Sequence, residues 1–165
     1  SEQQEKLHIT KNKGGIVVKG IHDVAVRFSK CCNPVPGDEI VGFVTRGRGM
    51  SIHRTDCVNV INLSAAERSR LITAEWEDPG DTEEGGQYLA ELKLYADDRR
   101  GLLLDITKVF TEEKIDVKSM NTRTSKKGTA TMDMGFIVHG REELNRVIKK
   151  LRQIENVIDI ERTTG

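Results

Sequence analysis

Two stretches in the second half of the chain alternate apolar and polar side chains, and this alternation most narrows the folds open to it. Apolar residues occupy every second position over 90–96 and again over 130–138. A period of two predicts strands with one buried face. Apolar spacings of three and four over 102–110 and 144–151 predict two amphipathic helices.

Two further β-rich segments complete this pattern. Residues 115–123 and 157–162 read as strands, and Lys126-Lys127-Gly128 reads as a hairpin turn. The predicted order is strand, helix, strand, strand, helix, strand. This is the ferredoxin-like βαββαβ arrangement, with both helices on one face of a four-stranded antiparallel sheet. We therefore expect a domain over residues 88–165.

The first half predicts a small β-rich domain over residues 14–76. Its short β-branched runs are separated by dense Pro and Gly turn chemistry over 33–38. The segments predicted as strands are 16–18, 24–28, 40–44 and 71–76, and a short helix is expected over 56–62. The chain as a whole is thus expected to be α+β.

Two polar segments flank this first domain. Residues 1–13 lack periodicity and are interpreted as a disordered end or the remnant of a linker. Residues 77–87 form an acidic, Gly-rich linker with almost no apolar side chains to offset the entropy of ordering. Because the chain begins with Ser1, we interpret it as part of a longer protein.

Composition excludes several classes of protein. The 165 residues are 36% hydrophobic and 32% charged, which is typical of a polar globular protein. No apolar run approaches the roughly 20 residues of a membrane helix, and no signal peptide opens the chain, so no membrane partner is expected. Net charge is zero, yet residues 1–63 hold nine basic against six acidic side chains. Only this front part favours a polyanionic partner.

Three cysteines and one histidine in the first half form a candidate metal site. An odd cysteine count without a secretory signal favours a reducing, cytoplasmic setting over a disulfide scaffold. Cys31, Cys32, His53 and Cys57 supply four side chains of the kind that zinc prefers. The adjacent cysteines can both face one metal only if the chain turns at Asn33. Otherwise one of them binds alone, or one packs in the core as a small apolar residue.

Four basic residues surround this cluster and form a candidate RNA-binding patch: Lys30, Arg46, Arg48 and Arg54. Arg matches phosphate geometry, and Gly47 and Gly49 allow a partner to approach the backbone closely. Few aromatic residues interleave, so contacts to the RNA backbone or shape are expected rather than base stacking. The alternative is a solvated basic turn.

Longer motifs give the chain a specific resemblance. The run RFSKCCNPVPGDEIVG (residues 27–42), with TRGRG (45–49) and HRTDC (53–57), resembles the conserved-cysteine, zinc-finger-like module of the RelA/SpoT family. These proteins are long bifunctional (p)ppGpp synthetases and hydrolases of the bacterial stringent response. Residues 88–165 are similar to the ACT domain that ends them.

The resemblance implies a regulatory role. In the family, the catalytic domains lie upstream, and this C-terminal region inserts between the ribosomal subunits and controls them. The cysteine module is then expected to contact ribosomal RNA, on ribosomes that carry uncharged tRNA. ACT domains commonly dimerise and bind amino acids, which implies a side-by-side homodimer here.

The loop between the first strand and first helix of the second domain is a candidate amino-acid site. Helix N–H groups favour a carboxylate, and Gly101 leaves the approach open. The loop also resembles the ligand loop of ACT domains, although Arg100 stands where the family more usually has Pro. Asn121 is a polar candidate across a dimer interface. The predicted ligand-binding residues are Asp97, Arg99, Arg100, Gly101, Leu102, Leu103 and Asn121. The alternative is a plain strand-to-helix connection.

We find little sign of catalysis. Cys57 and His53 suggest a nucleophile and base, but no third orienting group is evident. The Cys31-Cys32 pair is not a C-x-x-C redox motif, and the chain has no P-loop. We expect no catalytic residues and no organic cofactor, with zinc as the one candidate cofactor. The competing hypotheses are a zinc- or thiol-dependent enzyme, and an amino-acid sensor whose cysteine module is purely structural.

Overall fold

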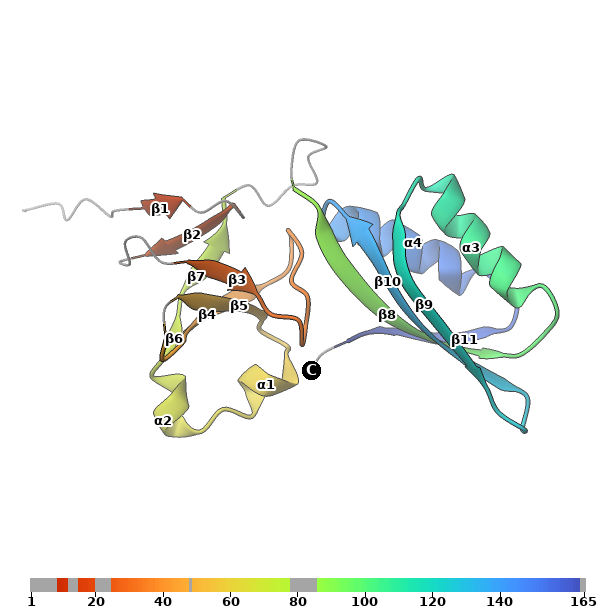
Figure 1. Cartoon of the computed structure of the whole chain (residues 1–165), viewed down its shortest axis with the longest axis horizontal. Helices are drawn as coiled ribbons and strands as arrows, with labels where there is room; N and C mark the ends of the chain where they lie inside the picture. Colours follow the sequence, from red (N-terminus) through yellow and green to blue (C-terminus); the bar gives the residue numbers. More distant parts are fainter. Residues whose placement is uncertain (1–8, 12–14, 20–24, 48, 78–85, 164–165) are drawn as a thin grey trace, which may run out of the picture. The chain divides into compact units, whose positions relative to one another are not determined.

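A computed structural model describes residues 9–11, 15–19, 25–47, 49–77 and 86–163 (Figure 1). The chain divides into two compact units, formed mainly by residues up to Pro79 and by Gly80–Thr163. Arg48, Val24, most of the predicted linker and residues 1–8 lie outside the described residues. Within the described ranges, no helix is long and apolar enough to cross a membrane.

The first unit contains two small sheets. One has the order β1-β2-β7, formed by Ile9–Lys11, Ile16–Lys19 and Ala74–Trp76. The other has the order β3-β5-β4-β6, formed by Val26–Phe28, Met50–Arg54, Ile40–Val44 and Leu71–Ile72. Two short helices follow β5, namely α1 (Val58–Ile61) and α2 (Ala65–Arg68).

The core of the first unit takes side chains from both sheets. Its buried members are Ile16, Val18, Ile40, Met50, Ile52 and Ala74. The Phe28 and Trp76 rings stack beside them with centroids 5.6 Å apart. Because this core is small, a bound metal would add appreciably to the stability of the unit.

Four features of this unit differ from the sequence-based predictions, and the first is that β5 forms outside the four predicted strands. The single strand expected over 71–76 is split into β6 and β7, which belong to different sheets. Residues 9–11 form a strand that pairs with β2 and extends its sheet, although no regular structure was expected there. Helix α2 was also missed. A capping box starts it, in which Ser64 and Glu67 satisfy each other's backbone N–H groups, and the S-x-x-E spacing signals it in the sequence.

The second unit is the predicted βαββαβ domain. Its elements are β8 (Tyr88–Asp97), α3 (Leu102–Glu112), β9 (Val117–Thr124), β10 (Thr129–Val138), α4 (Arg141–Arg152) and β11 (Val157–Arg162). The sheet order is β11-β8-β10-β9, and every pairing is antiparallel. Strands β8 and β10 pair over ten residues each, and the predicted hairpin turn at Gly128 joins β9 to β10.

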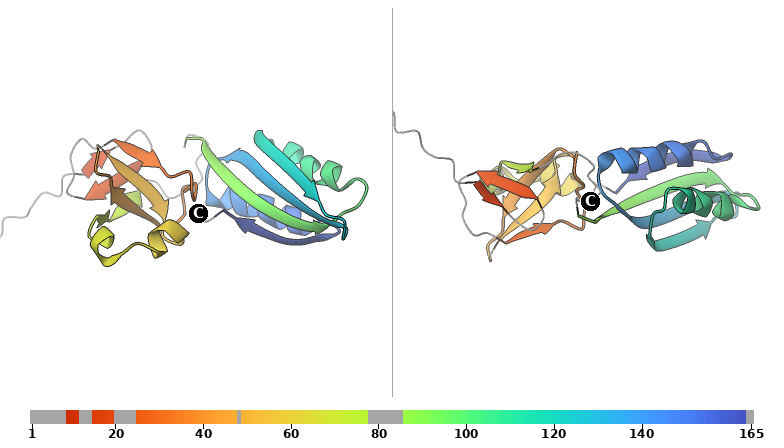
Figure 2. Two further views of the ribbon diagram at one scale, coloured as in Figure 1. Left: turned by 60° about the horizontal axis from the view of Figure 1, so that its bottom comes forward. Right: turned by 90° about the horizontal axis from the view of Figure 1, so that it is seen from above.

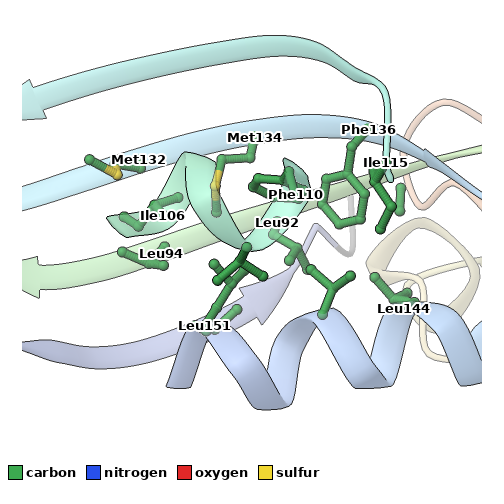
Figure 3. Packing of buried hydrophobic residues seen from close by; sticks show 14 of the residues in the cluster. Leu92, Leu94, Ile106, Phe110, Ile115, Met132, Met134, Phe136, Leu144 and Leu151 are labelled. Atoms are coloured by element: carbon green, nitrogen blue, oxygen red, sulfur yellow. The ribbon is translucent and has the colours of Figure 1, made fainter. Parts of the chain in front are cut away.

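One apolar core lies between this sheet and both helices. The inward positions of β8 and β10 meet the buried face of α3 and α4, as Figure 3 shows for Leu92, Met134, Ile106 and Leu144. The rings of Phe110 and Phe136 contact each other at a centroid distance of 4.9 Å. The left view of Figure 2 shows the four strands in front of both helices. Both helices of this unit thus lie on one face of its sheet, and none of its described helices covers the other face, as the alternation predicts.

Candidate metal centre and its surroundings

The four predicted metal-ligand residues come together from three segments of the first unit. Cys31 and Cys32 lie in a turn, His53 on β5, and Cys57 at the N-cap of α1. The Asn33 N–H donates to the Ser29 carbonyl at 2.9 Å, and Asn33 has φ +46°. Because this turn takes the adjacent cysteines off an extended strand, both thiols can face the same point.

The distances between these ligand atoms suit a tetrahedral metal. Cys31 Sγ is 3.5 Å from Cys57 Sγ and 3.5 Å from His53 Nδ1. Cys32 Sγ is 4.0 Å from Cys31 Sγ and 3.8 Å from the same nitrogen. All four atoms lie within 4.8 Å of one another. Zn–S bonds of about 2.3 Å give a tetrahedron with edges of about 3.8 Å. The residues therefore fit Zn²⁺.

These four ligands match a structural zinc site rather than a catalytic one. Three thiolates and one imidazole complete the four-coordinate shell that structural zinc adopts, whereas catalytic zinc keeps one position for water or substrate. Cys32 and Cys57 are buried and Cys31 is half-buried. The bound metal would supply cross-linking of three chain segments, and the protein residues around it would exclude water.

Arg54 supports the centre from behind. Its backbone N–H donates to Cys32 Sγ at 3.3 Å, and its guanidinium donates to the Cys32 carbonyl at 3.2 Å and to Asp56. An N–H donor to sulfur stabilises the thiolate form that binds metal. The sequence groups Arg54 with the RNA-binding residues, but its side chain is only 7% exposed. Its burial and these partners indicate that Arg54 supports the cysteine centre rather than contacting RNA.

The protonation chemistry differs among the four groups. Burial raises the pKa of the Cys32 and Cys57 thiols. Burial also opposes the Cys31 thiolate, but hydrogen bonds from Asn59, Cys57 and other neighbours outweigh it and lower the pKa of Cys31. Burial lowers the pKa of His53, which favours the neutral imidazole that ligates metals.

His53 connects the cluster to two serines. Its Nδ1 faces the thiols, while its Nε2 lies 2.9 Å from Ser29 Oγ and 3.1 Å from Ser51 Oγ. Metal-bound histidines usually use their second nitrogen in this way, which fixes the ring orientation. Sequence reasoning missed both serines, since neither is a ligand itself.

The predicted basic residues separate into exposed and buried members. Lys30 and Arg46 are exposed, as the RNA prediction requires, and Arg48 lies outside the described residues. The structure adds a cation that the sequence did not single out. The Arg70 guanidinium lies over the Phe43 ring, 4.7 Å from its centroid. Hydrogen bonds at Ser64 lower the pKa of Glu67, with smaller contributions from Arg70 and Arg46, so these two cations lie near the same carboxylate.

The candidate amino-acid loop of the second unit is fixed by Arg99. Its guanidinium donates to Asp105 at 2.7 Å and to the Glu155 carbonyl at 3.2 Å, which ties the start of α3 to the turn before β11. Gly101 adopts φ +80° at the N-cap, a conformation that favours glycine. Arg99 is thus a positioning residue, while Arg100 and Asp97 are exposed.

The remaining predicted ligand-binding residues do not share one surface. Leu102 is buried in the core, whereas Leu103 is 48% exposed on α3. Asn121 pairs with Asp133 on β10, on the sheet face away from the helices. Within one copy of the chain, Asn121 and α3 therefore lie on opposite faces of the sheet.

Two family models match the chain and together cover most of it. Residues 16–77 match the RelA/SpoT RIS domain, and residues 84–162 match the ACT domain. A solved ACT domain from the GTP pyrophosphokinase of Chlorobium tepidum is 23% identical, covers 47% of this chain and 99% of its own, and has a TM-score of 0.43.

Curated relatives share both domains in one stretch. A GTP pyrophosphokinase of Escherichia coli is 39% identical over 157 residues, which is 94% of this chain and 21% of the relative. One from Streptomyces coelicolor is 41% identical over 151 residues, 92% of this chain and 17% of the relative. The chain spans about a fifth of the length of these relatives. It therefore belongs to the RelA/SpoT family and carries that family's regulatory RIS and ACT domains.

Proposed function

We propose that this chain is the non-catalytic regulatory part of a (p)ppGpp synthetase and hydrolase, and that its RIS domain docks on ribosomal RNA. The observation that carries the proposal is the thiol-imidazole centre, which fixes the turn from Ser29 to Asn33 and presents Lys30 on its outer side. The relatives are named GTP pyrophosphokinases, so the enzymatic activity belongs to domains outside this chain.

RNA contacts around Lys30 and Arg46 would be mainly to phosphates. Lys30 and Arg46 are exposed cations, and each phosphate that they neutralise releases counterions. Phe43, with Arg70 above it, adds one planar pair that can stack on an unpaired base. Uncharged tRNA on the ribosome is a partner of the parent protein in this proposal. A reducing, cytoplasmic setting suits it because the centre needs free thiols.

Ribosome binding by a charge-reversed variant tests the docking proposal. Arg46→Glu should weaken co-sedimentation of the zinc-loaded chain with ribosomes by about ten-fold or more, and should flatten its salt dependence. Lys126→Glu is the matched control, because it makes the same change in net charge on the exposed hairpin of the other domain. Equal loss in both variants, or loss in neither, would contradict docking through the RIS domain.

We infer a second activity for the ACT domain, namely dimerisation and amino-acid binding. Strand β9 ends the sheet in the part of the chain that the structure describes, and its outer edge offers backbone groups that can pair with a second copy in a side-by-side dimer. The loop at Gly101 presents the N-terminus of α3 to a carboxylate. Light scattering that shows a strict monomer at high concentration would argue against the dimer.

A calorimetric screen of the twenty amino acids tests the ligand. Binding that is lost in Gly101→Val supports the loop as the site, since a branched side chain is strained at φ +80°. The alternative function is an amino-acid sensor in which the cysteine module is only structural. Amino-acid binding without ribosome binding would favour that alternative.

A further inference from the structure

A small hollow lies beside the metal centre on one face of the second sheet of the RIS domain. Strands β3 and β5 pair in parallel, with Arg27 opposite Ser51. Paired residues project to the same face, so Arg27 and Ser51 share it with His53, two positions further along β5. The hollow has a volume of about 240 Å³ and is lined by Arg27, Phe28, Ser29, Lys30 and Ser51.

The lining of this hollow suits a tetrahedral oxyanion. Arg27 and Lys30 supply two exposed cations, and the less exposed Ser29 and Ser51 supply two hydroxyls. None of the five lining residues carries a negative charge. Guanidinium, ammonium and hydroxyl donors together are the set that proteins use for phosphate oxygens.

His53 couples these hydroxyls to the metal site. A metal on Nδ1 leaves the ring proton on Nε2, which then donates to a serine oxygen. Neither serine then has to donate its hydrogen to His53, so the Ser51 hydrogen is available to an anion in the hollow, and the Ser29 hydroxyl is shared with the Cys31 side chain. In the other tautomer the proton is on Nδ1, and Nε2 accepts a hydrogen from one serine. One donor is then lost to the hollow.

We propose that this hollow binds a phosphate group, and that metal at the neighbouring centre favours this by releasing the serine hydroxyls from donating to His53. The inference rests on the docking proposed above, since it assigns Arg27, Ser29 and Ser51 to an RNA backbone phosphate. A free nucleotide carries the same chemistry and is the other source of a phosphate.

The first measurement uses inorganic phosphate as the probe. Phosphate titrated into the full zinc-loaded chain should shift the amide resonances of Ser29 and Ser51 in ¹⁵N spectra, with smaller shifts in zinc-free protein. Imidazole ¹⁵N spectra read the His53 tautomer directly, and should report Nε2–H once zinc is bound. Phosphate shifts at Ser29 and Ser51 that are the same with and without zinc would overturn the coupling.

The second measurement uses a labelled RNA hairpin and anisotropy at saturating zinc, because the serines also support His53. Ser29→Ala with Ser51→Ala should weaken RNA binding about ten-fold, through the loss of hydrogen bonds to a charged group. Arg27→Gln, which leaves the His53 contacts intact, should lower the salt slope by about one. Ser69→Ala is the matched control, since its hydroxyl bonds only the Ala66 carbonyl among the described contacts. GTP competing at equal phosphate concentration distinguishes a nucleotide site from an RNA site.

The outcomes separate the two proposals. Normal RNA binding by the serine and Arg27 variants, with loss in Arg46→Glu, overturns the phosphate hollow and leaves docking intact. If the wild-type chain binds no RNA but phosphate still shifts Ser29 and Ser51, the docking fails and the hollow stands as a site for a free phosphate compound. If phosphate and RNA both leave these serines unaffected, the hollow is refuted.

Discussion

Zinc binding should determine the thermal stability of the RIS domain and leave the ACT domain unchanged. The two compact units predict two unfolding transitions in a calorimetric scan of the full chain. The ACT core contains the largest buried side chains and no metal ligands, so its transition is an internal reference. The RIS transition should move with zinc.

The size of this shift follows from mass action. Free zinc at about 1,000 times its Kd stabilises the folded state by about 4.1 kcal/mol. For a domain of this size, 1 kcal/mol moves Tm by about 4–8 °C, so loading should raise the RIS transition by roughly 15–30 °C. EDTA should reverse the change. The small RIS core makes this metal contribution a large part of the total stability.

Ligand variants make the test specific. Cys57→Ala removes a thiol from a fully buried position, so zinc should no longer raise the first transition at the same concentration. Ser69→Ala, on the surface of the same domain, should respond to zinc like the wild type. A RIS transition that ignores zinc and EDTA in the wild-type chain would refute the assignment, and so would a full zinc response in Cys57→Ala.

Three further predictions concern the ACT domain. Glu113→Gln should cost about 0.5–1 kcal/mol at pH 7, because the Lys150 ammonium 2.6 Å away lowers the pKa of Glu113. That stability is present above the unfolded-state pKa and is lost as pH falls through the folded-state value, so urea unfolding should show the variant and wild type converging in acid. Phe136→Ala should cost about 3–5 kcal/mol in the ACT transition alone, since the ring is fully buried; an equal shift in the RIS transition would contradict this. Arg99→Met should speed amide exchange around Gly101, because two loop tethers are removed; unchanged exchange would show that Arg99 does not position the loop.

The ACT fold could be predicted from the sequence, because the order of its strands and helices follows from the local spacing of apolar residues. Alternation over β8 and β10 specifies one buried face, and the helices repeat every three to four residues. The site in this domain was harder to predict. The partners of Arg99 lie in the α4 to β11 turn and on α3, and no spacing along the chain reports that contact.

In the RIS domain, the cluster of candidate metal ligands was easier to predict than the strands. All four predicted metal ligands converge. They could be chosen from the sequence because cysteine and histidine are metal-binding residue types wherever they stand in the chain. The strands were less well predicted: β6 and β7 are adjacent in sequence but join different sheets, which only tertiary pairing decides. The Phe43 and Arg70 pair was missed for the same reason, since it joins β4 to the residue before β6.

The position of each cation on the second RIS sheet explains which of them can meet RNA. Side chains alternate along β5, so Ser51 and His53 project to one face, and Arg54 projects to the other. Arg54 is therefore buried against Cys32, and its guanidinium also reaches the exposed carboxylate of Asp56, although Arg54 follows His53 directly. Arg27 lies on a neighbouring strand and was not in the predicted patch, yet the parallel register places it opposite Ser51. The identity of the cysteines and the histidine thus points to the side chains that converge on one centre, while strand register and exposure decide which basic residues are available to the proposed phosphate site.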